Sequence, residues 1–213
     1  MKIGIIGAGK LGTVLGQLAL KAGYQVLIAG SATPEKIELT VAVLLPGAAA
    51  VTTQQAARQA DLVILALPLS HYKQLDKTDF AGKIVIDATN YWRPTDGLLA
   101  EVLTPGLTSS EQIQHHLSAS QVVKALNHIG YHELLEAPRP QGNPNRKAVA
   151  IAANQPIALA SVKKFVDSLG FDPLVIGSLA QGKLLQPGSP AFGADVTKAE
   201  LKVILETYAK KIN

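Results

Sequence analysis

The sequence contains no cysteine among its 213 residues. The chain can therefore form no disulfide, and cysteine nucleophiles, cysteine zinc sites and cysteine-ligated iron–sulfur clusters are excluded. Aromatic residues are scarce, at 5% of the chain, and the formal net charge is only +4. Because the basic residues are scattered and no aromatic residues lie among them, nucleic-acid binding is not expected.

Long apolar runs are also absent. No stretch of about 18 apolar residues occurs, so we expect no membrane span. The first apolar segment starts at the second residue, which leaves no room for a signal peptide. These features predict a cytoplasmic protein. The 47% of hydrophobic and 17% of charged residues favour a sheet that is buried on both faces, in one domain over residues 1–213.

The first thirty residues carry the most informative pattern. An apolar run over residues 2–6 predicts a buried strand, and a Gly-x-Gly-x-x-Gly turn follows it over residues 7–12. A helical apolar period continues to residue 22, and residues 24–29 predict the next strand. This order of strand, glycine turn, helix and strand is typical of a dinucleotide-binding unit.

Each glycine of the turn has a physical role in this interpretation. Gly7 allows the tight turn, Gly9 lets the backbone approach a pyrophosphate, and Gly12 lets the helix pack on the strand. The phosphate then lies over free N–H groups at the positive end of the helix dipole. We expect it at Gly7, Ala8, Gly9, Lys10, Leu11 and Gly12. The alternative is a tight structural turn without a ligand.

The end of the second strand favours NADP(H) over NAD(H). An NAD enzyme typically places a carboxylate there to bond the ribose 2′-hydroxyl. Here the strand is followed by Gly30-Ser31-Ala32-Thr33, and the first acid is Glu35. A 2′-phosphate would meet no repelling carboxylate, and the candidate contacts are Gly30, Ser31, Thr33 and Lys36. Ser31 and Thr33 could instead cap the following helix, and the two roles are compatible.

Further candidates follow the next two predicted strands, over residues 61–67 and 82–87. The carboxyl ends of parallel strands line the ligand crevice, which places Leu67, Pro68, Leu69 and His71 beside the cofactor. His71 could also be a solvent-facing loop histidine. Asn90 follows the second of these strands and could fix the nicotinamide amide or a substrate.

A strand over residues 121–126 contains Lys124 in an otherwise apolar run. The lysine either reaches a cofactor phosphate or substrate, or marks the exposed end of the strand. Asn127 and His128 come next and are the strongest candidates for substrate contact. The adjacent pair His115 and His116 cannot share a helix face, so no metal site is expected.

Several of these segments together resemble a known family. They are IGIIGAGKLG (residues 3–12), AGS (29–31), VILALPLSHY (63–72), IVIDATNYW (84–92) and VVKALNHIGYHEL (122–134). The chain resembles the NADPH-dependent reductases of coenzyme F420, a deazaflavin, and the related oxidoreductase domain of the STEAP metalloreductases. The first motif is generic to Rossmann proteins, and the last is the most distinctive.

The resemblance implies NADP(H) as cofactor and a flavin-type or deazaflavin acceptor that stacks on the nicotinamide. It places this acceptor near Leu67, Pro68, Asn127 and His128, and it implies a homodimer. In the family a Ser-Arg pair binds the 2′-phosphate, and Ser31 matches, but Ala32 stands in place of the arginine. The strength of the NADP preference is therefore open.

The predicted fold is α/β, a Rossmann-type doubly wound and mainly parallel sheet with a small C-terminal extension. Residues 1–135 form the dinucleotide-binding core, and residues 136–213 form the extension. The stretch over residues 177–193 is rich in glycine and proline and resembles the family's loop near the hydride site. We expect it to be a long loop that acts as a lid.

Two other functions stay open from the sequence. A hydroxy-acid or small-carbonyl dehydrogenase would need a positioned base, for which Lys124 and His128 are available. Such enzymes usually also carry a separate helical domain of about a hundred residues, which this chain does not supply. A non-enzymatic NADP(H)-binding redox sensor would bind the dinucleotide without turnover.

Overall fold

The computed structural model of the protein describes residues 1–212. Within these residues one sheet has the strand order β3-β2-β1-β4-β5-β6-β7-β8. The six strands from β1 to β6 run parallel, β7 is antiparallel to β6, and β8 is parallel to β7. The strands are β1 (Lys2–Ile6), β2 (Gln25–Ala29), β3 (Ala49–Ala50), β4 (Leu62–Leu65), β5 (Ile84–Asp87), β6 (Gln121–Lys124), β7 (Ala148–Ala153) and β8 (Asp172–Gly177). The predicted doubly wound Rossmann-type sheet is confirmed.

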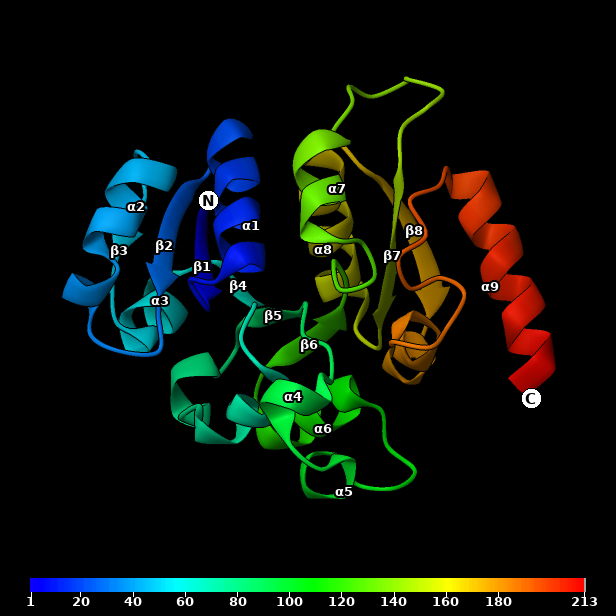
Figure 1. The fold of residues 1–213 in the computed structure, drawn as a ribbon, viewed down its shortest axis with the longest axis horizontal. Helices are drawn as coiled ribbons and strands as arrows, with labels where there is room; N and C mark the ends of the chain where they lie inside the picture. The colour runs from blue at the N-terminus through cyan, green and yellow to red at the C-terminus, as the bar shows by residue number, and fades with distance from the viewer. Residues whose placement is uncertain (213) are drawn as a thin grey trace.

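Helices cover both faces of this sheet (Figure 1). One face buries an apolar cluster under α1 (Lys10–Lys21), α2 (Glu38–Leu44), α7 (Tyr131–Glu136) and α8 (Pro156–Ser168). The other face is covered by α3 (Thr53–Gln59), α5 (Leu99–Val102), α6 (Ser109–His116) and the 3-10 helices η2 (Leu69–Gln74) and η3 (Lys77–Phe80). A third cluster joins β7 and β8 to η4 (Leu179–Leu185) and α9 (Lys198–Ile212). The strand residues between these layers are mainly apolar, as burial on both faces requires, and Asp87 and Lys124 at the ends of β5 and β6 are buried charged exceptions.

Local capping fixes where two helices of the second face begin. At α3, the Thr52 hydroxyl accepts from the Gln55 N–H, and the Gln55 side chain accepts from the Thr52 N–H. Thr108 and Glu111 form the same capping box at α6. Each box satisfies two N–H groups that a helix start leaves free. The box at Thr108 fixes the start of α6 at Ser109.

The structure differs from the sequence prediction mainly after the strands. The predicted strand over residues 61–67 ends at Leu65, and the one over 121–126 ends at Lys124. Four short elements were not predicted, namely η2, η3, α4 (Arg93–Asp96) and α7. The loop predicted over residues 177–193 is not structureless, because it contains η4, whose Leu179, Leu184 and Leu185 are buried. Apolar contacts with the sheet organise this segment.

The residues after 136 extend the same sheet (Figure 1). Strands β7 and β8 continue it at one edge, α8 covers one of their faces, and η4 and α9 pack on them. Arg146 anchors this part: its guanidinium is buried and donates to the carboxylates of Asp167 at 2.7 Å and Asp172 at 2.9 Å. Over residues 1–212 we find no helix with the length and apolar character that a membrane crossing needs.

Candidate functional site

The turn between β1 and α1 is shaped for a close approach to its backbone. Gly7 has a φ of 119°, and a Cβ on it would overlap the carbonyl oxygen of Ala66. A Cβ on Gly12 would overlap the Gly7 carbonyl oxygen. Gly9, in contrast, has an ordinary φ of −82°, and nothing lies within 4 Å of the position its Cβ would take. The fold itself therefore requires Gly7 and Gly12, whereas Gly9 borders open space.

The start of α1 can attract an anion to that space. No side chain caps the helix, and its first turn contains no acidic residue. The N–H groups of this first turn therefore have no side-chain cap, and they carry the positive end of the dipole of a helix of 12 residues. A phosphate group is the ligand that such a helix start suits best.

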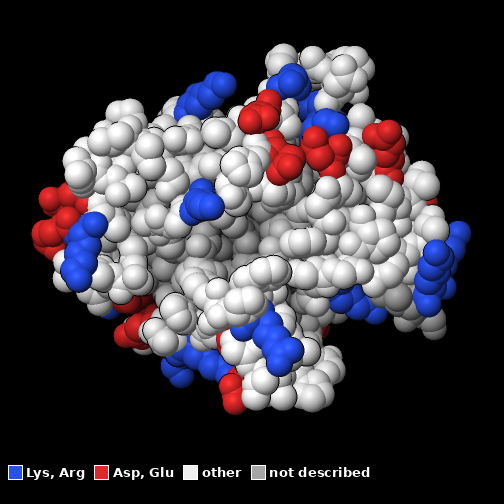
Figure 2. Space-filling model, viewed as in Figure 1, with Lys and Arg blue, Asp and Glu red and all other residues white. Residues whose placement is uncertain are grey.

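A cleft of about 930 Å³ lies beside the glycine turn. It brings together eight of the predicted cofactor-binding residues, which are Gly7, Ala8, Gly9, Gly30, Ser31, Leu67, Pro68 and His71. We call it the glycine cleft. In the view of Figure 2 the surface is hollowed near its middle, and Lys, Arg, Asp and Glu side chains lie mostly around the periphery.

Other predicted residues lie outside this lining. Leu69 and Gly12 are buried, and Leu11 is partly buried in α1. Lys10 lines an adjoining groove of about 500 Å³ between α1, α2 and α7, where its ammonium lies 3.3 Å from the Tyr131 hydroxyl. Thr33 precedes η1 (Pro34–Lys36) and Lys36 is its last residue, and both are exposed.

The end of the cleft at Ser31 has donors but no arginine among its lining residues. The Thr33 hydroxyl bonds the Glu35 carboxylate, which lowers the pKa of Glu35. Ser31 lines the cleft and is exposed, whereas Lys36 is exposed outside its lining. The capping alternative for Ser31 and Thr33 finds no support, since no side chain caps η1.

Sequence reasoning missed several residues that line the glycine cleft. Thr53 and Gln54 lie at the start of α3, and the position of this helix after β3 could have indicated them. Asp76 and Asp79 also line the cleft, but they belong to the turn around η3, which has no sequence period. Asp79 is paired with Arg58 at 2.6 Å.

Two asparagines, Asn90 and Asn127, meet just beyond the carboxyl ends of β5 and β6. The Asn90 amide donates to the Asn127 carbonyl at 2.7 Å, and the Asn127 amide donates to the Asn90 side-chain oxygen at 3.0 Å. Asn127 also donates to the Leu185 carbonyl of η4 at 2.7 Å. The segments after β5, after β6 and in η4 are thus joined at one point, and none of these three residues is in the lining of the glycine cleft.

Lys124 follows neither of the alternatives that the sequence left open. Its side chain is fully buried and donates to the Asp87 carboxylate at 3.1 Å and to the Thr89 carbonyl at 2.5 Å. Burial lowers the pKa of Lys124, and the Asp87 carboxylate opposes that shift. The lysine is therefore not at an exposed strand end, and both its contacts are with the protein.

His128 is also buried, with 1% of its surface exposed. Its Nε2 accepts a hydrogen bond of 2.9 Å from the Ala150 N–H of β7, and its carbonyl accepts one of 2.7 Å from the Gly193 N–H. Burial lowers the pKa of His128 to about 4, although the Ala191 backbone acts in the opposite direction. The ring is therefore neutral at pH 7, with its proton on Nδ1, and it connects β7 to the segment before α9.

Comparisons with known proteins agree with this geometry. Residues 2–91 match the family model described as NADP oxidoreductase, coenzyme F420-dependent. The metalloreductase STEAP3 of Rattus norvegicus is 32% identical over 185 residues, which are 85% of this chain and 35% of STEAP3. Over residues 2–91 the chain thus matches this NADP oxidoreductase family, and over most of its length it is similar to STEAP3. It spans only about a third of STEAP3, so the activity of the whole metalloreductase does not transfer directly.

Two solved structures are similar over nearly their whole length. The hypothetical protein SMa0349 of Sinorhizobium meliloti has a TM-score of 0.79 and 27% identity, and the match covers 93% of this chain and 95% of that one. A protein of Arthrobacter sp. FB24 described as an F420-dependent NADP-reductase has a TM-score of 0.69 and 20% identity, with 99% and 93% covered. The second likeness supports the fold alone.

NADP(H) is the cofactor of this oxidoreductase family, and the residues at the glycine turn fit it. The open space at Gly9 admits a pyrophosphate that a Cβ would obstruct. The uncapped start of α1 supplies N–H groups for it. Among residues 1–212 we find no cluster of three or more His, Cys, Asp or Glu side chains that could hold a metal ion.

The burial of His128 predicts a pH-dependent stability. Its folded pKa of about 4 lies below the ordinary value of 6.5, so the unfolded chain binds the proton more tightly between these values. The stabilisation is complete above pH 6.5 and is lost as the pH falls towards 4, by about 3 kcal/mol. Urea unfolding of the native protein and of His128→Gln from pH 7 to pH 4 checks this. Equal losses in both proteins would contradict it.

Proposed function

We propose that the protein transfers a hydride between NADP(H) and a flavin-type or deazaflavin acceptor. The cofactor supplies the hydride chemistry, and the protein orients the two rings and excludes water. The glycine turn holds the pyrophosphate, Ser31 and Lys36 meet the 2′-phosphate, and the carboxyl ends of β4, β5 and β6 form the floor for the nicotinamide. Asn90 and Asn127 provide amide groups that orient the rings there.

One observation carries this proposal: both candidate bases at the end of β6 are already engaged within the protein. Lys124 is bonded to Asp87 and Thr89, and the His128 Nε2 is bonded to Ala150. Oxidising an alcohol needs a base that reaches the substrate hydroxyl, whereas hydride transfer between two redox rings needs none. The dehydrogenase alternative is therefore the weaker one. We assign Asn127 to ring contact and His128 to holding the segment over residues 186–193.

The proposal is tested by offering acceptors to the purified protein with NADPH, namely coenzyme F420, FMN, FAD and ferric chelates. Loss of absorbance at 340 nm with F420 or a flavin supports it. Turnover with a small carbonyl compound alone would favour a dehydrogenase. Tight NADPH binding without turnover of any acceptor would favour the redox sensor. We also propose a homodimer, and the mass from light scattering tests this separately.

The missing arginine predicts a modest cofactor preference that can be raised. Ala32 is exposed beside Ser31, at the position where the family has its arginine. An arginine there could form charge-assisted bonds to a 2′-phosphate. We expect Ala32→Arg to raise the preference for NADPH over NADH by roughly 10- to 100-fold, since such bonds contribute about 1.5–3 kcal/mol. The ratio of kcat/KM for the two cofactors measures it, and Ala32→Gln, which adds length without charge, is the control. An unchanged ratio would place the 2′-phosphate elsewhere.

A further inference from the structure

Lys124 has no role in the hydride transfer just proposed, yet it lies at the edge where that transfer would occur. It is the last residue of β6 and lies beside Asp87, the last residue of β5, in the register of the two parallel strands. Neither side chain is exposed. A buried ion pair is weak evidence for stability, because an apolar pair of the same volume often serves as well. Its position at the carboxyl ends of the two strands therefore suggests another use.

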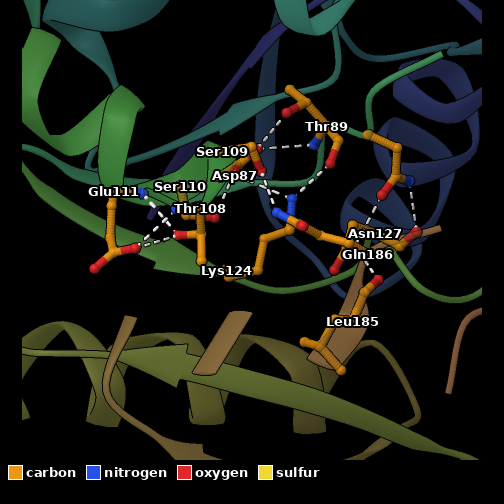
Figure 3. A network of polar contacts seen from close by, with 11 residues as sticks. Asp87, Thr89, Thr108, Ser109, Ser110, Glu111, Lys124, Asn127, Leu185 and Gln186 are labelled. Atoms are coloured by element: carbon orange, nitrogen blue, oxygen red, sulfur yellow. Dashed lines mark hydrogen bonds and ion pairs between the residues drawn. The ribbon is translucent and has the colours of Figure 1, made fainter. Parts of the chain in front are cut away.

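The network around the pair is closed. The Asp87 carboxylate accepts from the Thr89 N–H at 2.9 Å, from the Thr89 hydroxyl at 2.6 Å and from the Ser110 hydroxyl of α6 at 2.6 Å. With the Lys124 ammonium these donors fill the carboxylate. Figure 3 shows the lysine pointing between Asp87 and Thr89. Such a fully satisfied network in a low dielectric is rigid.

The network continues into the predicted nicotinamide floor. Lys124 holds the Thr89 carbonyl, which belongs to the peptide that leads into Asn90. Asn90 then exchanges hydrogen bonds with Asn127. Leu126 lies between Lys124 and Asn127 and has a φ of 66°. Among the described residues, no other residue except glycine has a positive φ. A leucine keeps this costly conformation only where its surroundings enforce it, and such sites gather at functional positions.

Lys124 also supports the C-terminal segment that closes the site. A Cβ on Gly182 of η4 would lie 3.3 Å from the Lys124 Cγ, so the backbone of η4 lies against the lysine stem. Three residues later, the Leu185 carbonyl accepts from Asn127. Gln186 then donates to the Ser109 hydroxyl of α6 at 3.1 Å. The segment is thus packed against Lys124 and bonded to Asn127 and to Ser109, the residue before Ser110.

We propose that Lys124 is a positioning residue for the hydride transfer, which sets Asn90 and Asn127 through the Thr89 carbonyl and the Asp87 carboxylate. It also holds η4 against them. Lys124 does not touch the cofactor or the acceptor, and it acts through the two amides. This inference rests on the proposed function. In it, Lys124 determines how the reacting rings are positioned. The affinity for the cofactor comes from the glycine turn instead.

The test compares Lys124→Met with two other variants in the full-length protein. Lys124→Met should lower kcat by roughly 10- to 100-fold, because a small misplacement of reacting groups has that effect. The Kd for NADPH should stay within about threefold, since the glycine turn is intact. The double variant Asp87→Asn/Lys124→Met removes both charges, so it should recover thermal stability but not kcat. Lys83→Met is the matched control, because Lys83 bonds the carbonyls of Arg58 and Ala60 at the opposite edge of the sheet. It should leave kcat unchanged.

Three results would overturn the inference. They are a Lys124→Met kcat equal to that of Lys83→Met, a double variant with recovered kcat, and a kcat loss matched by an equal loss of NADPH affinity. If the native protein reduces none of the acceptors, the proposed function fails. The positioning role of Lys124 can still be tested, by measuring the fluorescence of bound NADPH. Its nicotinamide fluorescence lifetime should shorten in Lys124→Met and not in Lys83→Met, and equal lifetimes would overturn the role.

Discussion

Replacing Asp87 with alanine is expected to lower the free energy of unfolding by about 3–5 kcal/mol, because it leaves the buried Lys124 ammonium without its countercharge. The same change removes the acceptor of both Thr89 bonds and of the Ser110 hydroxyl. For a chain of this length the loss corresponds to a fall in Tm of about 10 °C. Urea unfolding at pH 7 measures it.

The control for Asp87→Ala is Asp61→Ala. Asp61 is exposed and accepts one hydrogen bond of 2.8 Å from the Lys2 N–H, at the opposite edge of the sheet. Its removal should cost about 1 kcal/mol, the usual value for one such bond. An equal fall in the free energy of unfolding in the two variants would contradict this. It would show that the buried Lys124 ammonium does not need the Asp87 carboxylate.

Replacing Gly9 with valine is expected to weaken NADPH binding by at least about 100-fold while leaving the fold intact. The valine side chain would occupy the space where we place the pyrophosphate, and displacing that group would remove several phosphate contacts to the start of α1. The backbone of Gly9 has ordinary extended angles, and no protein atom lies near its Cβ position. Calorimetric titration with NADPH measures the affinity, and the Tm checks the fold.

Gly12→Ala gives the contrasting result. Its Cβ would overlap the Gly7 carbonyl, so this variant should lose stability rather than affinity alone. The two glycines of one motif are therefore expected to fail in different ways. Unaltered NADPH affinity in Gly9→Val would remove the phosphate role of the turn. A large fall in its Tm would show that Gly9, like Gly12, serves the fold.

The glycine turn could be predicted because its information is local. Gly7, Gly9 and Gly12 lie within six residues, between a strand and a helix whose periods are clear. The carboxyl-end rule then pointed to Leu67, Pro68, Leu69 and His71, and all but the buried Leu69 line one cleft, since parallel strands bring these ends to one edge. No side-chain detail was needed for either step.

The partners of Lys124 and His128 could not be predicted in the same way. Asp87 and Lys124 are 37 residues apart, and their pairing depends on the register of two strands. His128 meets Ala150 only because β7 runs antiparallel to β6, and no sequence signal fixes that direction. The 3-10 helices η2 and η3 were missed for a related reason. Packing of Tyr72 and Phe80 against the sheet determines them, and such turns have no period of their own.

The most direct test of the hydride-transfer proposal is a single turnover with NADPH that carries two deuterium atoms at C4 and with coenzyme F420, under anaerobic conditions and with enzyme in excess. A deazaflavin accepts the hydride on carbon, so the label stays in the product and can be weighed by mass spectrometry. The proposal predicts one deuterium in the reduced acceptor and none in the solvent, with a primary isotope effect that grows in Lys124→Met. A reduced F420 without deuterium, or a bound labelled NADPH that stays unreacted with F420, FMN and FAD alike, would contradict it.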